Sequence, residues 1–206
     1  RHLRFAWRLA PSGAGTLSAL IGLSAVYNCF DAQDRKAKSF LELLEAEMHT
    51  QVLGDGCHIS RNPSDQLMLL RELIWLRAIL SSIQEPIPTA LTSTIEHMGP
   101  MLGFFRQGNG SLALFHGSVE EDPVTITETL AAFPGKMRPR SRAPHGRFER
   151  LASGPSLVIL DTGPPAPDPF SASAHASTLA LEFSVGRERL VVNCGHRASG
   201  KEVRAR

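Results

Sequence analysis

Several features that would assign a function at once are scarce in this 206-residue sequence. It has three cysteines, Cys29, Cys57 and Cys194, and no Cys-x-x-Cys pair, so a paired-cysteine metal site is not indicated. One cysteine stays unpaired in any disulfide scheme, and we expect buried thiols. The sequence also lacks a glycine-rich phosphate-binding loop and a Gly-x-Ser-x-Gly motif, so nothing indicates nucleotide-dependent or serine-hydrolase chemistry.

Long apolar runs and a strong net charge are missing as well. The most apolar stretch, residues 17–26, is shorter than the ~20 residues needed to cross a bilayer and contains serines and a glycine. We therefore predict no membrane span. The stretch follows a basic start, as in a signal peptide, but no signal peptide is clearly visible. The formal net charge of +2 is too small to indicate a partner, so the distribution of charge matters more than its total.

The first half of the sequence has helical periodicity. Asn62 followed by Pro63 is a strong helix start, because an asparagine can cap the helix and proline suits its first position. Residues 111–115 are expected to form a short strand, and residues 124–133 fit a helix or a strand equally. Apolar residues at spacings of three and four predict helices over residues 16–30, 31–53, 63–83 and 91–105.

The second half has the alternating pattern of strands. Leu179, Leu181 and Phe183 alternate with other residues, and a turn around Gly186 precedes a second apolar run, which predicts a β-hairpin. Because helices precede strands, we predict an α+β protein with an antiparallel sheet rather than a parallel α/β fold. The expected strands cover residues 148–151, 157–161, 179–183 and 190–193. The expected parts are residues 1–108 (helical), 109–145 (connecting) and 146–206 (sheet).

A motif surrounds this hairpin. His175 precedes the first strand, and Asn193-Cys194-Gly195 closes the second. This order resembles the heparinase II/III family of polysaccharide lyases, whose C-terminal β-sandwich carries His-x-His-x-Asp-x-Leu-Ser-Phe-Glu-Leu and then Asp-x-Gly. The first histidine, the following acid and the metal-binding aspartate of the family pattern fall on Ser173, Ser177 and Asn193. A second, weaker match is residues 55–63, which look like the family's Asp-Gly-Ser-x-x-Glu-x-Ser loop before a helix.

The resemblance implies an architecture and a metal site. It implies the last helices of an incomplete α/α toroid followed by the first strands of an antiparallel β-sandwich, and hence a piece of a longer protein. In the family, the second histidine and the aspartate help to hold a structural zinc. The corresponding candidates are His175 and Asn193. Since a neutral amide is a poorer ligand for a divalent cation than a carboxylate, zinc is not assumed.

The resemblance also implies a reaction, β-elimination in a uronate-containing polysaccharide. Tyrosine and histidine normally share its proton transfers, because the work needs groups with a pKa near neutrality. The single tyrosine, Tyr27, lies outside both motifs, so the expected base is missing or upstream. The catalytic candidates are His175 and His58. The alternatives are that His175 only bonds the backbone at a strand end and that His58 is a polar loop residue.

The basic segment from Lys136 to Arg150 suggests the partner. A guanidinium group can bind a carboxylate or a sulfate through two parallel hydrogen bonds. The candidate substrate-binding residues are therefore His145 and Arg147 of this segment, together with Arg61 of the earlier loop. The expected partner is an acidic polysaccharide like heparin, heparan sulfate or alginate, and not nucleic acid, while a solvated linker is the structural alternative. If the protein is not a lyase, it is a non-catalytic carbohydrate-binding or cell-envelope assembly module. The resemblance places it in the cell envelope or periplasm.

Overall fold

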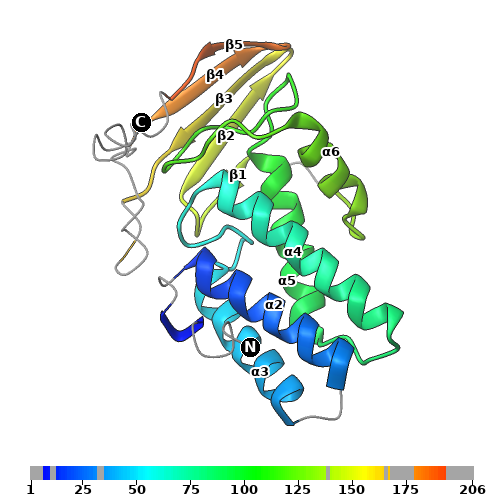
Figure 1. The fold of residues 1–206 in the computed structure, drawn as a ribbon. Helices are drawn as coiled ribbons and strands as arrows, with labels where there is room; N and C mark the ends of the chain where they lie inside the picture. The colour runs from blue at the N-terminus through cyan, green and yellow to red at the C-terminus, as the bar shows by residue number, and fades with distance from the viewer. Residues whose placement is uncertain are drawn as a thin grey trace, which may run out of the picture.

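The computed structural model describes residues 7–9, 13–31, 35–137, 140–164, 167 and 179–193. A short 3-10 helix and four long helices pack side by side at one end of the molecule (Figure 1). The four long helices confirm the predicted ones. Their bounds are η1 Trp7–Leu9, α2 Ala14–Asp31, α3 Arg35–Gln51, α4 Pro63–Ser82 and α5 Thr89–Phe104.

Local signals explain where α4 begins and how it packs. The Asn62 side chain accepts hydrogen bonds from the backbone N–H groups of Ser64 and Asp65, at 2.8 and 3.4 Å, and Pro63 occupies the first helical position. These bonds satisfy N–H groups that no earlier helical carbonyl can reach. One face of α4 lies in the core of the helical part. Its buried apolar residues include Leu69, Leu73, Leu76 and Leu80.

At the other end of the molecule is a five-stranded antiparallel sheet in which neighbours in sequence are neighbours in space (Figure 1). The predicted hairpin is confirmed: Gly186 turns with a φ of 59° and Phe183 pairs with Val191. The edge strand β1 was not predicted. The strands are β1 Arg142–Ala143, β2 Phe148–Ser153, β3 Ser156–Asp161, β4 Leu181–Val185 and β5 Glu188–Val191.

The segment between α5 and the sheet differs from the prediction in one place. Residues 111–115 do not form a strand; Leu112 makes only an isolated bridge to Arg106. A side chain takes the place of a neighbouring strand, because the Leu114 N–H donates to Glu182 Oε1 at 2.8 Å. The ambiguous stretch that follows is a helix, α6 (Pro123–Ala132), and the Asp122 carboxylate caps it by accepting from Val124 N at 3.0 Å.

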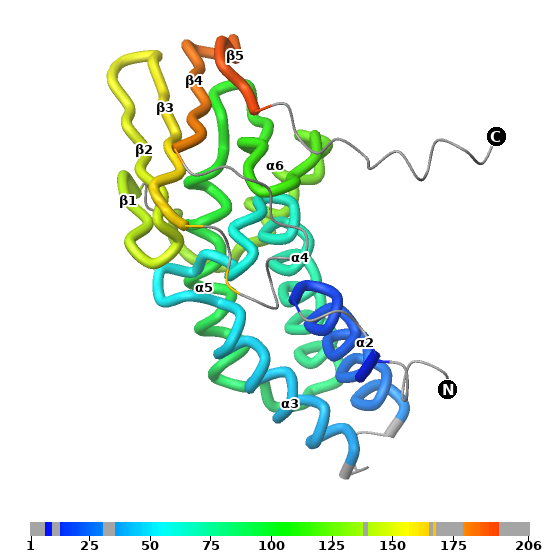
Figure 2. Tube along the Cα trace, turned by 90° about the vertical axis from the view of Figure 1, so that its left-hand side faces the viewer, coloured from blue at the N-terminus to red at the C-terminus, as the bar shows by residue number. Residues whose placement is uncertain are grey.

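The two faces of the sheet have different surroundings. The α5–α6 segment lies along one face (Figure 2), where Leu157, Ile159 and Ser184 are buried. Phe148 of β2 packs against Phe105 and Phe115 of that segment, with ring centroids 5.0 and 5.2 Å apart. On the other face the strand register aligns an apolar row, Leu151–Val158–Phe183–Val191. Within the described residues, no helix is long and apolar enough to span a membrane.

Candidate functional site at the helix–sheet junction

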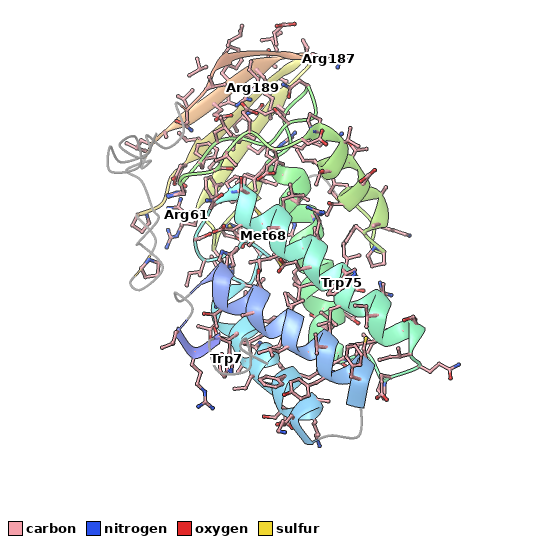
Figure 3. All side chains as sticks on the ribbon, in the orientation of Figure 1. Trp7, Arg61, Met68, Trp75, Arg187 and Arg189 are labelled. Carbon is pink, nitrogen blue, oxygen red and sulfur yellow. The ribbon has the colours of Figure 1, made fainter. Side chains whose placement is uncertain are left out.

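Three charged or titratable residues from distant parts of the chain meet where the helices reach the sheet. Arg61 comes from the loop before α4, His116 from the α5–α6 segment, and Asp161 from the end of β3. Figure 3 shows Arg61 at this boundary. All three residues are buried, with exposed fractions of 5%, 3% and 0%. We call them the junction cluster.

The Asp161 carboxylate is the centre of the junction cluster. One oxygen, Oδ1, accepts from Arg61 Nη2 and from the Gly163 N–H at 2.9 Å, and Oδ2 lies 2.7 Å from His116 Nε2. The Arg61 guanidinium also donates to the carbonyl oxygens of Gly146 and Pro164 and lies over the Phe148 ring, 4.8 Å from its centroid. A buried carboxylate is stable only when paired in this way.

The backbone of the junction is strained. Arg61, His116 and Arg147 have φ values of 61°, 50° and 58°, in the left-handed region that glycine prefers. Strain of this kind costs on the order of 1–3 kcal/mol per residue and persists only where surrounding contacts hold it. At Gly163 a side chain would crowd its neighbours, because a Cβ there would lie 2.6 Å from Arg147 Cβ and from Arg61 Nη2. Because these strained residues gather around Asp161, we treat this region as a candidate site.

Asp55 joins the same two parts of the molecule from the second family-like motif. Its Oδ2 accepts from the backbone N–H groups of His145 and Gly146, both at 2.8 Å, and its Oδ1 accepts from Cys57 N at 3.1 Å. Its carbonyl oxygen accepts from Arg140 Nη1 at 2.6 Å. The basic segment is therefore not a solvated linker: it forms β1 and the start of β2 and is bonded to the helical part.

His58 lies inside the protein, with no exposed surface. Its Nε2 lies 3.0 Å from Gln51 Oε1, and Nδ1 lies 2.7 Å from Ser60 Oγ and 3.2 Å from Ser60 N. Burial lowers the pKa of His58 from 6.5 to about 4, so the ring is neutral at neutral pH. A neutral ring donates through Nε2 to Gln51 and accepts at Nδ1. This environment supports the structural alternative for His58 and gives it no path to a polysaccharide.

The neighbouring Cys57 is equally enclosed. Its burial raises the pKa of the thiol, with the Asp55 carboxylate adding to the effect, so the reactive thiolate is disfavoured. Burial is also the main cause of a raised pKa at Asp65, whose Oδ2 accepts from Ser60 Oγ at 2.7 Å. Cys57, His58 and Ser60 thus form part of a closely packed interior beneath the loop before α4.

Solvent reaches the junction beside β1 and β2. A polar hollow of about 410 Å³ is lined by Arg142, Ala143, Pro144, Arg147, Glu149 and Thr162. Arg142 pairs with Glu149 at 2.7 Å, whereas Arg147 makes no side-chain ion pair with a described residue. Of the sequence-predicted candidates, Arg61 bonds the carbonyl oxygen of Gly146, which lies between His145 and Arg147 in the chain, and only His145 and Arg147 are exposed.

The metal candidates are only half placed. His175 lies outside the described residues, so its position is not assigned. Asn193 follows β5; its backbone N–H lies 3.2 Å from Glu182 Oε1, and its buried Nδ2 has no partner among the described residues. Glu182 already accepts from Gln107 and Leu114, and the described residues contain no group of three metal-ligating side chains. Of the two metal candidates, the described residues include only Asn193, which offers a neutral amide.

Sequence reasoning missed Asp161 and His116. Their signals were local: an acid ends an otherwise apolar strand, and a histidine precedes Gly117 in a loop. Neither pattern predicts that these two side chains, 45 positions apart in the sequence, form a hydrogen bond. Tyr27, the single tyrosine of this chain, packs on Phe40 of α3, with ring centroids 5.1 Å apart.

Comparisons with known proteins support the resemblance. Residues 135–205 match the family model described as heparinase II/III-like, C-terminal. FtsZ-localized protein C of Caulobacter vibrioides is 35% identical over 155 residues, which are 75% of this chain and 27% of that protein. The chain thus spans about a quarter of this curated relative.

Solved structures show the fold. Heparan sulfate lyase HepC from Pedobacter heparinus matches 92% of this chain and 33% of its own, with a TM-score of 0.69 and 16% identity. A crystal structure of heparinase III matches 88% of this chain and 34% of its own, with a TM-score of 0.65 and 12% identity. The predicted α+β fold is therefore confirmed, and the chain spans about a third of these proteins.

Proposed function

Because this chain belongs to the heparinase II/III-like proteins, we propose that it is a binding and assembly part of such a protein, able to hold an acidic polysaccharide but not to cleave it alone. One observation carries the proposal: Asp161 is bonded to Arg61, His116 and Gly163 inside the junction. The junction cluster thus links the loop before α4 and the α5–α6 segment to the end of β3. We propose that residues 1–108 and 146–206 are adjoining ends of two parts of the parent protein.

The proposed polysaccharide contact is the hollow beside β1 and β2. Exposed Arg147 lines it, exposed His145 follows its lining residue Pro144 in the chain, and Arg142 shares its charge with Glu149. A guanidinium fork matches the two oxygens of a uronate carboxylate or a sulfate. Binding there needs no proton transfer, which agrees with the buried state of His58 and the enclosed position of His116.

The test uses the full-length parent protein with heparin, heparan sulfate and alginate. Unsaturated-uronate absorbance reports cleavage, and salt-dependent retention on the immobilised polysaccharides reports binding. We expect no absorbance rise, and retention that weakens about fivefold or more in Arg147→Gln but not in Lys38→Gln, which removes an exposed charge from α3. Retention that is identical in all three proteins contradicts the proposed contact.

A second candidate is an active lyase whose catalytic tyrosine lies in the rest of the parent protein. The fold it shares with heparan sulfate lyase HepC favours it. The lyase is supported if absorbance rises with any uronan and if this rise is lost in a folded His116→Ala variant. The same result contradicts the proposal of a binding part that does not cleave.

The 35% identical relative supports a cellular setting. That protein is described as FtsZ-localized, and we propose that the parent of this chain likewise works with the FtsZ assembly at the cell envelope. Co-sedimentation of the parent with FtsZ polymers tests this. We expect the parent in the pellet only when polymers are present; a parent that stays in the supernatant contradicts the setting but leaves the polysaccharide contact untouched.

A further inference from the structure

We propose a second binding site, for a single oxyanion group, in a polar hollow at the C-terminal end of α5. The hollow has a volume of about 430 Å³, and its lining residues are Gly103, Arg106, Gln107, Gly108, Asn109, Gly110 and Arg150. It lies between the end of α5 and β2, because Arg150 of β2 lines it and donates to the carbonyl oxygen of Phe104. The ligand class is a sulfate, phosphate or carboxylate. The site does not depend on the proposed function, because it uses none of the residues of the hollow beside β1 and β2.

The two arginines carry most of the unused donors. Arg106 Nη2 donates to Thr127 Oγ1 at 3.1 Å, but Arg106 Nε is buried without a partner among the described residues. Arg150 uses only Nε, which donates to the carbonyl oxygen of Phe104 at 3.1 Å. Neither forms an ion pair with a described carboxylate. Since each guanidinium has five N–H donors, most of them remain for a ligand.

The loop that follows α5 adds uncharged donors. The side-chain oxygen of Asn109 accepts from the N–H of Ser111 at 3.0 Å and from its hydroxyl at 2.7 Å, which fixes the orientation of the amide. Its amide nitrogen therefore has its two donors unused by any described residue. The backbone N–H groups of Gly108 and Asn109 also have no partner among the described residues. Donors of this kind commonly cradle oxyanions.

The nearby acid does not compete for the arginines. Glu182 is fully buried and accepts from Gln107 Nε2 and Leu114 N, both at 2.8 Å, with Arg189 Nη2 3.5 Å away. Gln107 in turn accepts from Ser184 Oγ at 2.8 Å. These bonds tie the loop to the sheet beneath the hollow. A site held in place before binding loses less entropy when the ligand arrives.

Two further observations favour an anion. Gly110 has a φ of +94°, and a Cβ there would lie 3.5 Å from Arg106 Nη2, so the loop packs closely against the guanidinium. Burial lowers the pKa of Arg150, which means that its charge is partly desolvated without a counter-ion. An oxyanion in the hollow would restore that lost stabilisation. The volume admits one such group with part of the molecule that carries it.

The test is calorimetric titration of the purified chain with inorganic sulfate, inorganic phosphate, a sulfated heparin tetrasaccharide and its desulfated form. We expect Arg106→Gln and Arg150→Gln each to weaken binding at least fivefold and the double variant to abolish it. Arg106→Lys keeps the charge but loses the fork, and should weaken binding less than Arg106→Gln. Arg71→Gln, an exposed arginine of α4, should bind as the unchanged chain does.

The probes also identify the source of the anion. A sulfated tetrasaccharide that binds at least tenfold more tightly than its desulfated form and than either inorganic ion indicates a sugar sulfate. Inorganic phosphate that binds more tightly than the tetrasaccharide indicates a phosphate ligand. Equal affinity in the double variant and the unchanged chain for every probe overturns the site. Circular dichroism of each variant shows that the chain is folded in every comparison.

Discussion

The junction cluster and the hollow at α5 both contain arginine, but the arginines are bonded in opposite ways. Arg61 uses three nitrogens on Asp161 and two backbone carbonyls and is 5% exposed. Arg106 and Arg150 each make one side-chain hydrogen bond to a described residue, at 3.1 Å, and line a polar hollow. Arginine that is buried and fully paired holds parts of a protein together, whereas arginine with unused donors can bind a ligand.

We expect the largest loss of stability when the junction cluster is broken. Asp161→Asn leaves the buried Arg61 charge without its counter-ion, and removing one partner of a buried pair costs about 3–5 kcal/mol of stability. We expect a loss of that size in the free energy of unfolding, measured by urea denaturation. Glu149→Gln, which breaks the exposed pair with Arg142, is the control, at about 0–1 kcal/mol. Similar losses in both variants would remove the distinction between buried and exposed pairs.

We expect a change of similar size in the free energy of unfolding when pH is lowered, because of His58. The pKa of His58 is about 4 in the folded protein and 6.5 ordinarily, so the unfolded chain binds this proton more readily. Stability from this group is therefore full above pH 6.5 and falls by about 3 kcal/mol as pH drops to 4. The difference in unfolding free energy between the unchanged chain and His58→Gln, measured across this range, isolates the group. Exposed His49→Gln is the control; a His58→Gln difference that does not vary with pH contradicts the buried neutral ring.

Asp55 should give a smaller effect. Asp55→Ala removes an acceptor from the backbone N–H groups of Cys57, His145 and Gly146, and leaving a buried donor unpaired costs about 1–3 kcal/mol. We expect this loss in urea denaturation together with faster amide exchange at His145 and Gly146. Unchanged exchange at both amides would show that Asp55 does not join the two parts.

The smallest effect is expected in the hollow at α5. Arg106→Gln removes a guanidinium whose single described bond is to Thr127, so we expect a stability change below about 1 kcal/mol. The urea midpoint of this variant measures it. A loss as large as that of Asp161→Asn would mean that Arg106 is structural, and the contrast between the two regions would fail.

The elements of the fold were accessible from sequence because their signals are local. The Asn62-Pro63 start, the four-residue spacing of α3 and the alternation of β4 each depend on residues within one or two turns or one strand. The prediction failed at residues 111–115, where Glu182 from a distant strand supplies the hydrogen bond. Edge strand β1 was missed because two residues carry no periodicity.

The sequence named Arg61, His145 and Arg147 as candidates but not Asp161 or His116. That Arg61 bonds the Gly146 carbonyl and lies near Arg147 is a finding of the structure. The sequence could not show that Arg61 is buried while Arg147 is exposed, because burial depends on how the β1–β2 turn meets the loop before α4.

The sequence by itself determined the helices, the hairpin and the α+β order of this protein, since backbone preferences and apolar spacing act over a few residues. Only the tertiary structure decided that Asp161 pairs with Arg61, 100 positions away, and with His116, 45 positions away. Electrostatic pairing and burial depend on distance in space, which a linear pattern does not contain. For the same reason, only the fold separated a bonded arginine from one with donors to spare.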